Sequence, residues 1–320
     1  MNICIDAFKN LNVVSSAGLK LGPCCLSTPM HAEKIDFYNN EYLQTVRNSW
    51  KQGIWPHACR DCKHTENQGL ISRRQGSNSW YRENDMYDTD VELVRLDYWT
   101  GDLCNLACTT CGPEFSSVWK KELNYPTGSK KTVVNDFWTS LDTSHLRYVH
   151  FNGGEPLLSR EHVKLLHALP DKSRIHLNYN TNATVLPDSE LIDLWSQYKL
   201  VQIDFSIDNI GTKFEYQRYP AKWNQVVDNL QWFINHAPHN CMFAVNTTVS
   251  MLNYHSLDNL SSWLQENFYV SRFTDPIEHR QQLAIGKLAT TASRELAIEF
   301  LDACDARRGT NWRTTFPELV

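Results

Sequence analysis

The chain has 320 residues, of which 42% are hydrophobic, 12% aromatic and 21% charged, and its formal net charge is -5 at pH 7. This composition is typical of a globular protein that buries its core in one large domain or two modest ones. It excludes membrane spans of roughly 18 to 20 apolar residues, and the opening stretch "MNICIDAFKN" is not a secretion signal. We therefore expect a cytoplasmic protein without a membrane or nucleic-acid partner, because the charge forms no long blocks.

Residues 1–85 are predicted to form a small domain that is rich in cysteine. The region consists of short segments between turns rather than long periodic elements. Its turn residues include Gly18, Gly22, Pro23, Pro29, Gly53 and Pro56. A region of this kind has little apolar sequence for a core of its own, so we expect bound metal to hold it together.

From about residue 86 the pattern changes to strands that alternate with helices. Apolar runs predict strands at 91–98, 147–152, 174–180, 200–207, 241–250 and 268–274. Helical periodicity lies between and after them, at 116–123, 160–169, 188–198, 223–236 and 256–268. This order predicts an α/β fold with a parallel sheet, either open or curved into a partial barrel, over residues 86–275. Residues 276–320 are predicted to be a helical extension with a closing helix that Gly309 ends.

The ten cysteines point to metal rather than to disulfides. A reducing cytoplasm keeps thiols reduced, so metal ligation or burial is what remains for them. Most of them fall into two groups in the sequence, which favours two metal sites. The ungrouped Cys241 and Cys304 are expected to be core residues.

Cys104, Cys108 and Cys111 form a C-x3-C-x2-C triplet directly after the strand predicted at 91–98. Parallel α/β proteins place their chemistry at the carboxyl ends of strands, so this loop is a candidate site. Structural zinc takes four protein ligands and catalytic zinc usually includes histidine, whereas three thiolates suit an iron-sulfur cluster with one open iron. A partial zinc site is the alternative for this spacing.

The triplet segment "CNLACTTCG" resembles the signature of the radical S-adenosylmethionine (SAM) superfamily. Two later segments strengthen the resemblance: "HFNGGEPLL" at 150–158 is similar to the family's GGE motif, and "IDFSIDN" at 203–209 to its Ser-x-Asp stretch. The resemblance implies a partial (β/α)6 TIM-like barrel and a 4Fe-4S cluster whose open iron binds SAM. One departure is Thr110, because the family often has an aromatic residue just before the third cysteine.

The remaining candidate residues for SAM follow the predicted strands. Glycine lets the backbone approach a ligand closely, a carboxylate can bind an ammonium group, and amides and hydroxyls can bind a ribose or a carboxylate. Taken singly, each of these segments is as readily an ordinary connection between a strand and a helix. The residues are Gly153, Gly154, Glu155, Asn180, Thr181, Asn182, Ser206, Asp208 and Asn246.

The amino-terminal cysteines resemble the four-ligand "twitch" module, a shorter relative of the SPASM domain. The stretch "SWKQGIWPHACRDC" has the same order of tryptophan, glycine, proline and C-x2-C. The resemblance implies a second, fully ligated 4Fe-4S cluster on Cys4, Cys24, Cys59 and Cys62, with the module placed before the barrel instead of after it. Cys25 competes with Cys24 for one ligand position, and tetrahedral zinc is the alternative for the whole set.

The resemblance also implies a reaction. Reductive cleavage of SAM would give a 5'-deoxyadenosyl radical that takes hydrogen from a peptide or small-molecule substrate, with flavodoxin or ferredoxin as reductant. Oxidation or cross-linking is the expected outcome, since a saturated cluster can accept an electron but cannot bind substrate. Epimerisation with Cys25 as hydrogen donor, or a zinc or iron-sulfur scaffold without turnover, are the alternatives. Cys4 stands almost at the start, which lowers the expectation of a leader-peptide domain.

Overall fold

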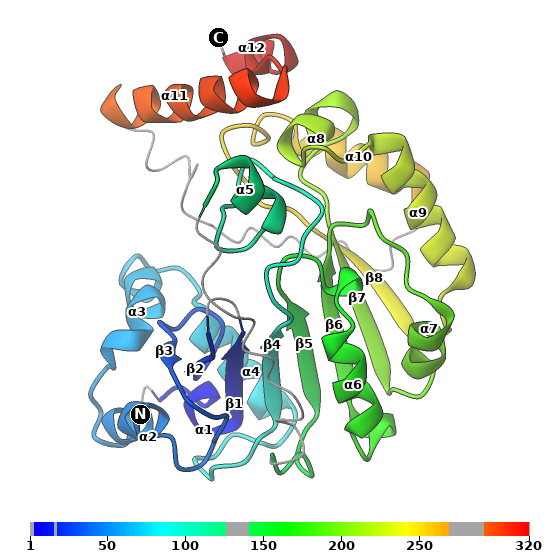
Figure 1. Ribbon diagram of the computed structural model, residues 1–320. Coiled ribbons are helices and arrows are strands. Elements are labelled where there is room, and N and C mark those ends of the chain that lie inside the picture. Colours follow the sequence, from blue (N-terminus) through cyan, green and yellow to red (C-terminus); the bar gives the residue numbers. More distant parts are fainter. Residues whose placement is uncertain (1–2, 16–17, 126–140, 269–290, 320) are drawn as a thin grey trace.

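The computed structural model describes residues 3–15, 18–125, 141–268 and 291–319, and its central element is an eight-stranded sheet (Figure 1). The strands lie in the order β3-β2-β1-β4-β5-β6-β7-β8. From β1 to β8 every neighbouring pair is parallel, whereas β2 and β3 add an antiparallel edge. The strands are β1 (Asn10–Val14), β2 (Lys20–Gly22), β3 (Met30–His31), β4 (Arg95–Trp99), β5 (Tyr148–Asn152), β6 (His176–Thr181), β7 (Leu200–Ser206) and β8 (Cys241–Asn246).

Helices surround this sheet in two groups. Figure 1 shows α6, α7, α9 and α10 beside β5–β8, and α1–α4 around β1–β3. The helices are α1 (Asp6–Lys9), α2 (Glu41–Lys51), α3 (Arg60–Asn67), α4 (Arg73–Glu83), α5 (Ser117–Glu122), α6 (Glu161–Ala168), α7 (Ser189–Trp195), α8 (Gly211–Gln217), α9 (Trp223–His236), α10 (Leu257–Asn267), α11 (Thr291–Arg308) and α12 (Trp312–Thr315). Short 3-10 turns lie at His57–Cys59, Pro156–Leu158, Lys172–Arg174 and Pro317–Leu319.

The two faces of the sheet differ in polarity. In β7, Val201, Ile203 and Phe205 are fully buried in the apolar core, whereas the alternate residues are only half-buried. Successive strand residues point to opposite faces, so those alternate positions form a second, polar face. On that face Asp97 pairs in register with His150. The apolar face packs against the helices to form the core, and the polar face can contact a ligand.

The predicted α/β class and alternating order are confirmed for the described residues. The strands predicted at 147–152, 174–180 and 200–207 agree with β5–β7 within two residues, and the helix at 223–236 agrees with α9. The first strand ends at the predicted place but begins at Arg95, and β8 ends at Asn246. The strand predicted at 268–274 lies almost wholly outside the described residues. The short helix α8 was not predicted.

The amino-terminal region is more regular than its sequence suggested. It contributes α1–α4 and three strands, and β1 pairs in parallel with β4. The first strand of the parallel set therefore comes from residues 10–14, and the sheet runs across the boundary predicted at residue 85. The sequence hid β1 because Asn10 and Asn12 are polar yet buried; Asn10 donates to Pro23 O and Asp97 Oδ2. The division into domains stays a prediction.

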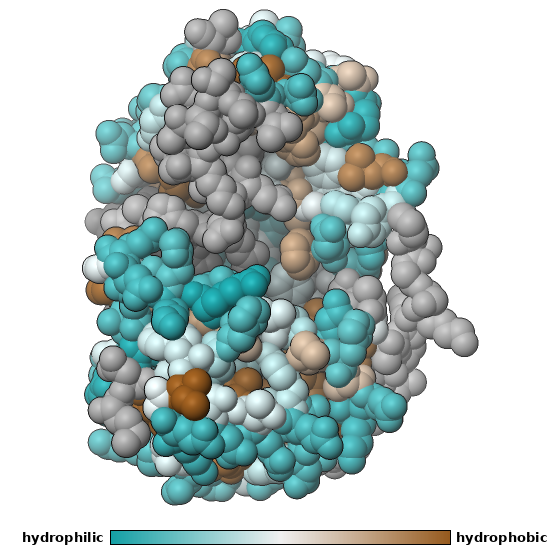
Figure 2. Space-filling model, turned by 90° about the vertical axis from the view of Figure 1, so that its left-hand side faces the viewer, coloured by the Kyte–Doolittle hydropathy of each residue, from teal (hydrophilic) through white to brown (hydrophobic). Residues whose placement is uncertain are grey.

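No helix in the described ranges has the length and apolar character of a membrane span. Figure 2 shows a face on which hydrophilic residues predominate and hydrophobic ones are scattered.

We expect His162 to make the stability of the fold depend on pH. Its ring is 1% exposed on α6 and lies against Phe151 and Tyr179, and burial lowers its pKa to about 4. As the pH falls, the His162 ring is therefore protonated in the unfolded chain before it is protonated in the folded chain. The free energy of unfolding should drop by about 2 kcal/mol between pH 7 and pH 5 as a result.

Urea unfolding at both pH values would measure this effect. His162→Phe should lose about 2 kcal/mol less than the parent chain over the same interval. The control is His167→Phe, which replaces an exposed histidine on the same helix. Because this variant keeps the buried His162 ring, its unfolding free energy should depend on pH as in the parent chain. An unchanged pH dependence in His162→Phe would contradict the assignment.

Candidate functional site

The cysteine triplet lies in the loop that joins β4 to α5. The loop is fixed by its own backbone: Ala107 N–H donates to Tyr219 O at 2.7 Å and Thr109 N–H to Gln217 O at 2.8 Å. At its end Ser117 Oγ accepts from Cys104 N–H and donates to Cys104 O. These bonds hold the cysteine positions from both sides, independently of any bound group.

Two side chains brace the carbonyls of the same loop. Trp119 Nε1 donates to Cys108 O at 2.9 Å, and Arg308 Nη2 from α11 donates to Ala107 O at 2.9 Å. Arg308 also pairs with Glu122 and lies over the Trp119 ring at 4.6 Å. The carboxyl-terminal helix thus contacts the candidate site directly, and Cys304 of this helix is fully buried beside it, as expected of a core residue.

The triplet opens into a cavity of about 510 Å³ at the carboxyl ends of the parallel strands. All three cysteines line it, together with predicted residues from the ends of four other strands, β5 to β8. The predicted residues that line it are Gly153, Gly154, Asn180, Asn182, Ser206 and Asn246. Glu155, Thr181 and Asp208 are not among the lining residues, and each has a different place.

The two glycines approach the cysteine loop rather than only a ligand. A Cβ on Gly154 would lie 2.4 Å from Leu103 O, and one on Gly153 would lie 2.8 Å from Thr100 Oγ1. Gly153 also has φ +144°, which favours glycine. Gly154 N–H donates to Gly101 O at 2.9 Å. The glycine pair therefore docks β5 against the triplet loop, a role that the sequence analysis did not include.

Glu155 is a structural carboxylate in this arrangement. It is 1% exposed and accepts from Leu157 N–H, Thr181 Oγ1 and Asn182 N–H at 2.7–3.1 Å. Burial raises its pKa to about 7, although these hydrogen bonds act in the opposite direction. Its carboxylate is thus committed to the turn after β6, where it holds Asn182 at the cavity, and the predicted bond to an ammonium group has no support from its position.

Arg218 is a site residue that the sequence analysis missed. It follows α8, lines the cavity and is 8% exposed, and its Nη2 lies 2.9 Å from Asp208 Oδ2. Arg218 Nε and Asn180 Oδ1 are buried atoms without a hydrogen-bond partner among the described residues. Together they offer a donor and an acceptor to a ligand with a carboxylate and a hydroxyl or ammonium group. No motif surrounds Arg218, so only its place in the fold identifies it.

The cavity also has an aromatic wall. Trp99 at the end of β4 and Phe115 after the triplet have ring centroids 5.0 Å apart, and both line the cavity with Thr110. Phe115 is thus an aromatic ring close to the triplet, although the residue before Cys111 is threonine. A flat apolar group can contact this wall.

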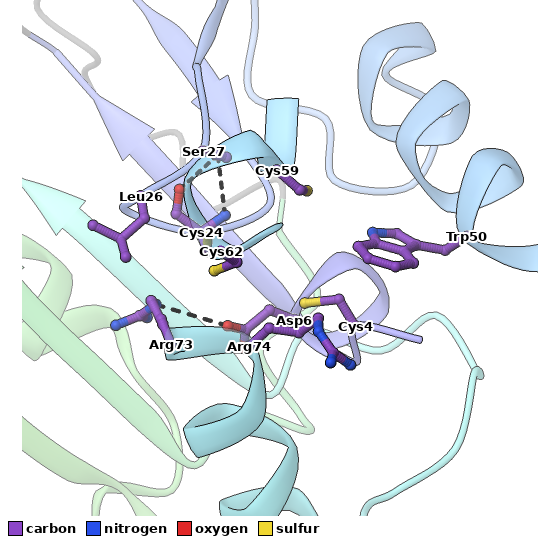
Figure 3. Close-up of a pocket in the computed structure, with 10 residues that line it drawn as sticks. All are labelled: Cys4, Asp6, Cys24, Leu26, Ser27, Trp50, Cys59, Cys62, Arg73 and Arg74. Carbon is purple, nitrogen blue, oxygen red and sulfur yellow. Dashed lines mark hydrogen bonds and ion pairs between the residues drawn. The ribbon is translucent and has the colours of Figure 1, made fainter. Parts of the chain in front are cut away.

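The four cysteines predicted for the second site meet around one smaller cavity (Figure 3). Cys4, Cys24, Cys59 and Cys62 come from four positions in the first 62 residues and line it with Asp6, Trp50, Arg73 and Arg74. The buried indole N–H of Trp50 lies at this cavity and acts on the Cys59 thiol as a hydrogen-bond donor, so it can also donate to a thiolate or sulfide bound here.

The cysteine thiols of both cavities have raised pKa values. Burial raises the pKa of Cys104 to about 11 and of Cys108, Cys24 and Cys59 to about 12. For Cys4, burial is followed by Asp6 and by the other three thiols of its cavity, which again raise the pKa. These side chains therefore hold protons at neutral pH until a metal replaces them.

The geometry of the four cysteines bears on the kind of metal. Zinc needs its ligands about 2.0–2.3 Å from one point. Within the described residues no group of three or more histidine, cysteine, aspartate or glutamate side chains meets the spacing for one ion. The cavity encloses about 10 Å³, the room of one water molecule, so a larger group requires the cysteine side chains to turn.

Adjacent cysteines in the sequence face different cavities. Cys24 lines the four-cysteine cavity, whereas Cys25 lines the larger cavity with the triplet. Leu26 borders both cavities. Cys24 is therefore the member of this pair that lies with Cys4, Cys59 and Cys62.

We expect Gly154→Ala to separate the cysteine loop from β5. The new methyl group would meet the backbone of Leu103, which cannot move without displacing Cys104, so the cost should be about 1–3 kcal/mol. The midpoint temperature of thermal unfolding and the iron content after anaerobic reconstitution should both fall. Gly76→Ala on α4, which meets nothing within 4 Å, is the control and should be neutral or slightly stabilising. Equal behaviour of the two variants would contradict the docking role.

Comparison with known proteins places this geometry in a family. The model of the radical SAM superfamily matches residues 100–258. The GTP 3',8-cyclase of Actinobacillus pleuropneumoniae serotype 7 (strain AP76) is 24% identical over 148 residues, which are 46% of this chain and 41% of that enzyme. The chain thus spans about two fifths of that curated relative.

Solved structures with a similar arrangement include two proteins with bound SAM. Streptococcus suis SuiB bound to SAM is 16% identical, with 92% of this chain and 59% of that chain covered and a TM-score of 0.41. SuiB bound to the precursor peptide SuiA is 14% identical, with 97% and 74% covered and a TM-score of 0.46. The anSMEcpe protein with bound SAM is 17% identical, with 68% and 62% covered and a TM-score of 0.44.

The matched residues 100–258 contain the cysteine triplet, the glycine pair and the ends of β5–β8 that line the larger cavity. The chain belongs to the radical SAM superfamily.

Proposed function

We propose that Cys104, Cys108 and Cys111 hold the SAM-binding 4Fe-4S cluster, and that SAM and substrate share the adjoining cavity of about 510 Å³. The observation that carries this proposal is the convergence of all three cysteines with the ends of β5–β8 on one cavity. Three thiolates leave one iron open for a cosubstrate. The volume is within the usual range for small-molecule sites.

Residues of the cavity wall have distinct roles in this proposal. Arg218 binds the carboxylate of SAM, and Asp208 holds the guanidinium in place at 2.9 Å. Asn180, Asn182, Ser206 and Asn246 supply amide and hydroxyl groups to the remaining polar groups of the ligands. Glu155 and Thr181 act indirectly, because they fix the turn that carries Asn182.

We further propose that Cys4, Cys24, Cys59 and Cys62 hold a second 4Fe-4S cluster. Their convergence on one cavity and the buried indole N–H donor of Trp50 beside Cys59 support this assignment. When bound, the first cluster would supply the electron that cleaves SAM to methionine and a 5'-deoxyadenosyl radical, and the second a place for an electron from the substrate. Arg73 and Arg74 lie beside the second site and would offset its negative charge.

Cysteine substitutions would test both assignments. Any of Cys104→Ala, Cys108→Ala or Cys111→Ala should abolish 5'-deoxyadenosine formation, because two thiolates cannot keep a defined open iron. Cys62→Ala should lower iron from about eight to about four per chain, with SAM cleavage retained.

Metal analysis after anaerobic reconstitution, together with chromatography of the cleavage products, gives the readout. Cys241→Ala is the matched control, since that cysteine begins β8 at the end opposite the cavity. Zinc without iron at both sites, or cleavage that survives in all three triplet variants, would refute the proposal.

For the net reaction we propose oxidation or cross-linking of a peptide or a small molecule. Removal of one hydrogen atom leaves a substrate radical that must still lose an electron and a proton. A cluster with four thiolate ligands has no open iron for substrate, but it can accept this electron. The reductant that starts each turnover would be flavodoxin or ferredoxin. The amide-rich wall and the Trp99–Phe115 pair accept either class of substrate.

A second candidate is epimerisation, which the position of Cys25 favours. Cys25 is partly exposed and lines the same cavity as the triplet. Its S–H could return a hydrogen atom to the substrate radical from the other face, which would invert the carbon. The sulfur would then need one electron and one proton from the external reductant to regenerate the thiol.

Heavy water distinguishes the two reactions. A substrate can be found as the compound that raises 5'-deoxyadenosine formation above its background rate, and mass spectrometry would then follow its product. Oxidation predicts a product with two hydrogens fewer, no deuterium on carbon, and a yield that survives Cys25→Ala. One deuteron on an inverted carbon, lost in Cys25→Ala and kept in Cys241→Ala, would establish epimerisation instead.

A further inference from the structure

A row of polar side chains crosses the inner face of the sheet between the two cavities. Asp97 on β4 stands in register with His150 on β5, and His150 with Asn178 on β6. Two residues further along, Asn152 and Asn180 occupy the same face and line the larger cavity. The row therefore lies directly beneath the wall of the cavity.

Asp97 is the fixed point of this row. It is 1% exposed, and its Oδ2 accepts from Asn10 Nδ2 at 2.8 Å and from Arg73 Nη2 at 3.2 Å. Burial alone would raise the pKa of Asp97, but Arg73 and the contact with His150 outweigh it and hold the pKa below the usual range. An ionised carboxylate can only accept hydrogen bonds.

His150 lies between Asp97 and the asparagines of the cavity wall. Its Nδ1 lies 3.3 Å from Asp97 Oδ1, and its Nε2 lies 3.0 Å from Asn180 Nδ2. Asn180 Nδ2 also donates to Asn152 Oδ1 at 2.7 Å, while Asn152 Nδ2 lies 3.0 Å from the imidazole Nδ1. Asp97 accepts only, so a hydrogen bond to it requires the Nδ1–H tautomer. In that tautomer the Asn152 NH₂ group makes no hydrogen bond to Nδ1, and Nε2 is the acceptor for Asn180.

This tautomer determines which way one amide of the cavity wall points. With its NH₂ group held by His150 and Asn152, Asn180 keeps Oδ1 as a buried acceptor that has no partner among the described residues. A buried acceptor of this kind requires a ligand donor, such as a hydroxyl or an ammonium group. SAM carries both groups.

We propose that Asp97 and His150 are positioning residues, which fix the amides of Asn152 and Asn180 for SAM and which Arg73 anchors to the four-cysteine cavity. The proposal rests on the proposed function of the larger cavity. Arg73 lines the four-cysteine cavity and lies 3.8 Å from Asp6 (Figure 3). The same guanidinium therefore contacts both Asp97 of the row and Asp6, a carboxylate of the four-cysteine cavity.

The first test measures the imidazole itself in the chain without metal. Nitrogen NMR of histidine-labelled protein, at a pH where the ring is neutral, should show the Nδ1–H tautomer for His150. Its signal can be identified by its loss in His150→Phe. Asp97→Asn should shift the population toward Nε2–H, which a purely space-filling role would not do. An Nε2–H tautomer in the parent chain would overturn the proposal.

The second test measures SAM affinity of the reconstituted full-length chain by equilibrium dialysis. His150→Phe should weaken SAM binding about fivefold to tenfold, the effect of one or two lost hydrogen bonds, with iron content unchanged. His176→Phe is the matched control, because His176 is half-buried on the adjoining β6 strand and packs edge-on against Tyr148. It should bind SAM like the parent chain.

The outcomes separate this inference from the function on which it rests. Parent-like SAM affinity in folded, iron-loaded His150→Phe would refute the positioning role and leave the cluster assignment intact. Failure of the parent chain to bind iron or SAM would refute the proposed function, while the tautomer measurement would still decide the hydrogen-bond arrangement.

Discussion

The register between β4 and β5 is the constraint on which the larger cavity depends. Trp99 pairs with Asn152, so the two connections that follow these strands start side by side. Gly153 and Gly154 then fit against the backbone of residues 100–103, where a side chain would collide. Because β5, β6, β7 and β8 continue in the same direction, their ends meet the cysteine loop at one edge. A slip in this register would move the triplet away from every other group of the site.

A second constraint is the unequal polarity of the sheet's faces. Fully buried parallel strands usually read as continuous apolar runs, because helices cover both faces. Here β7 alternates, with Ile203 and Phe205 in the core and Asp204 and Ser206 on the inner face. The inner face can hold polar groups because they satisfy one another, as Asn178 and Gln202 do with Asp204. The helices stabilise the fold by packing on the apolar face of the sheet, and the polar inner face can bind ligands.

How much the sequence predicted depends on the range of the interactions involved. Local patterns were sufficient for β5–β7, for α9 and for the cysteine triplet, because periodicity and spacing lie within a few residues. β1 was not predicted, since Asn10 and Asn12 are buried only through partners such as Pro23 and Asp97. Arg218 and the different faces of Cys24 and Cys25 depend on contacts across the fold. Glu155 was found by its motif, but its hydrogen bonds to the turn after β6 appear only in three dimensions.

The hydrogen bond from Arg308 to Ala107 joins positions 201 residues apart. During synthesis the segment around Ala107 leaves the ribosome long before Arg308 does, so the cysteine loop spends that interval without its last brace. In the folded chain the same guanidinium lies over Trp119 and pairs with Glu122. The loop therefore receives this brace only after nearly the whole chain has been made.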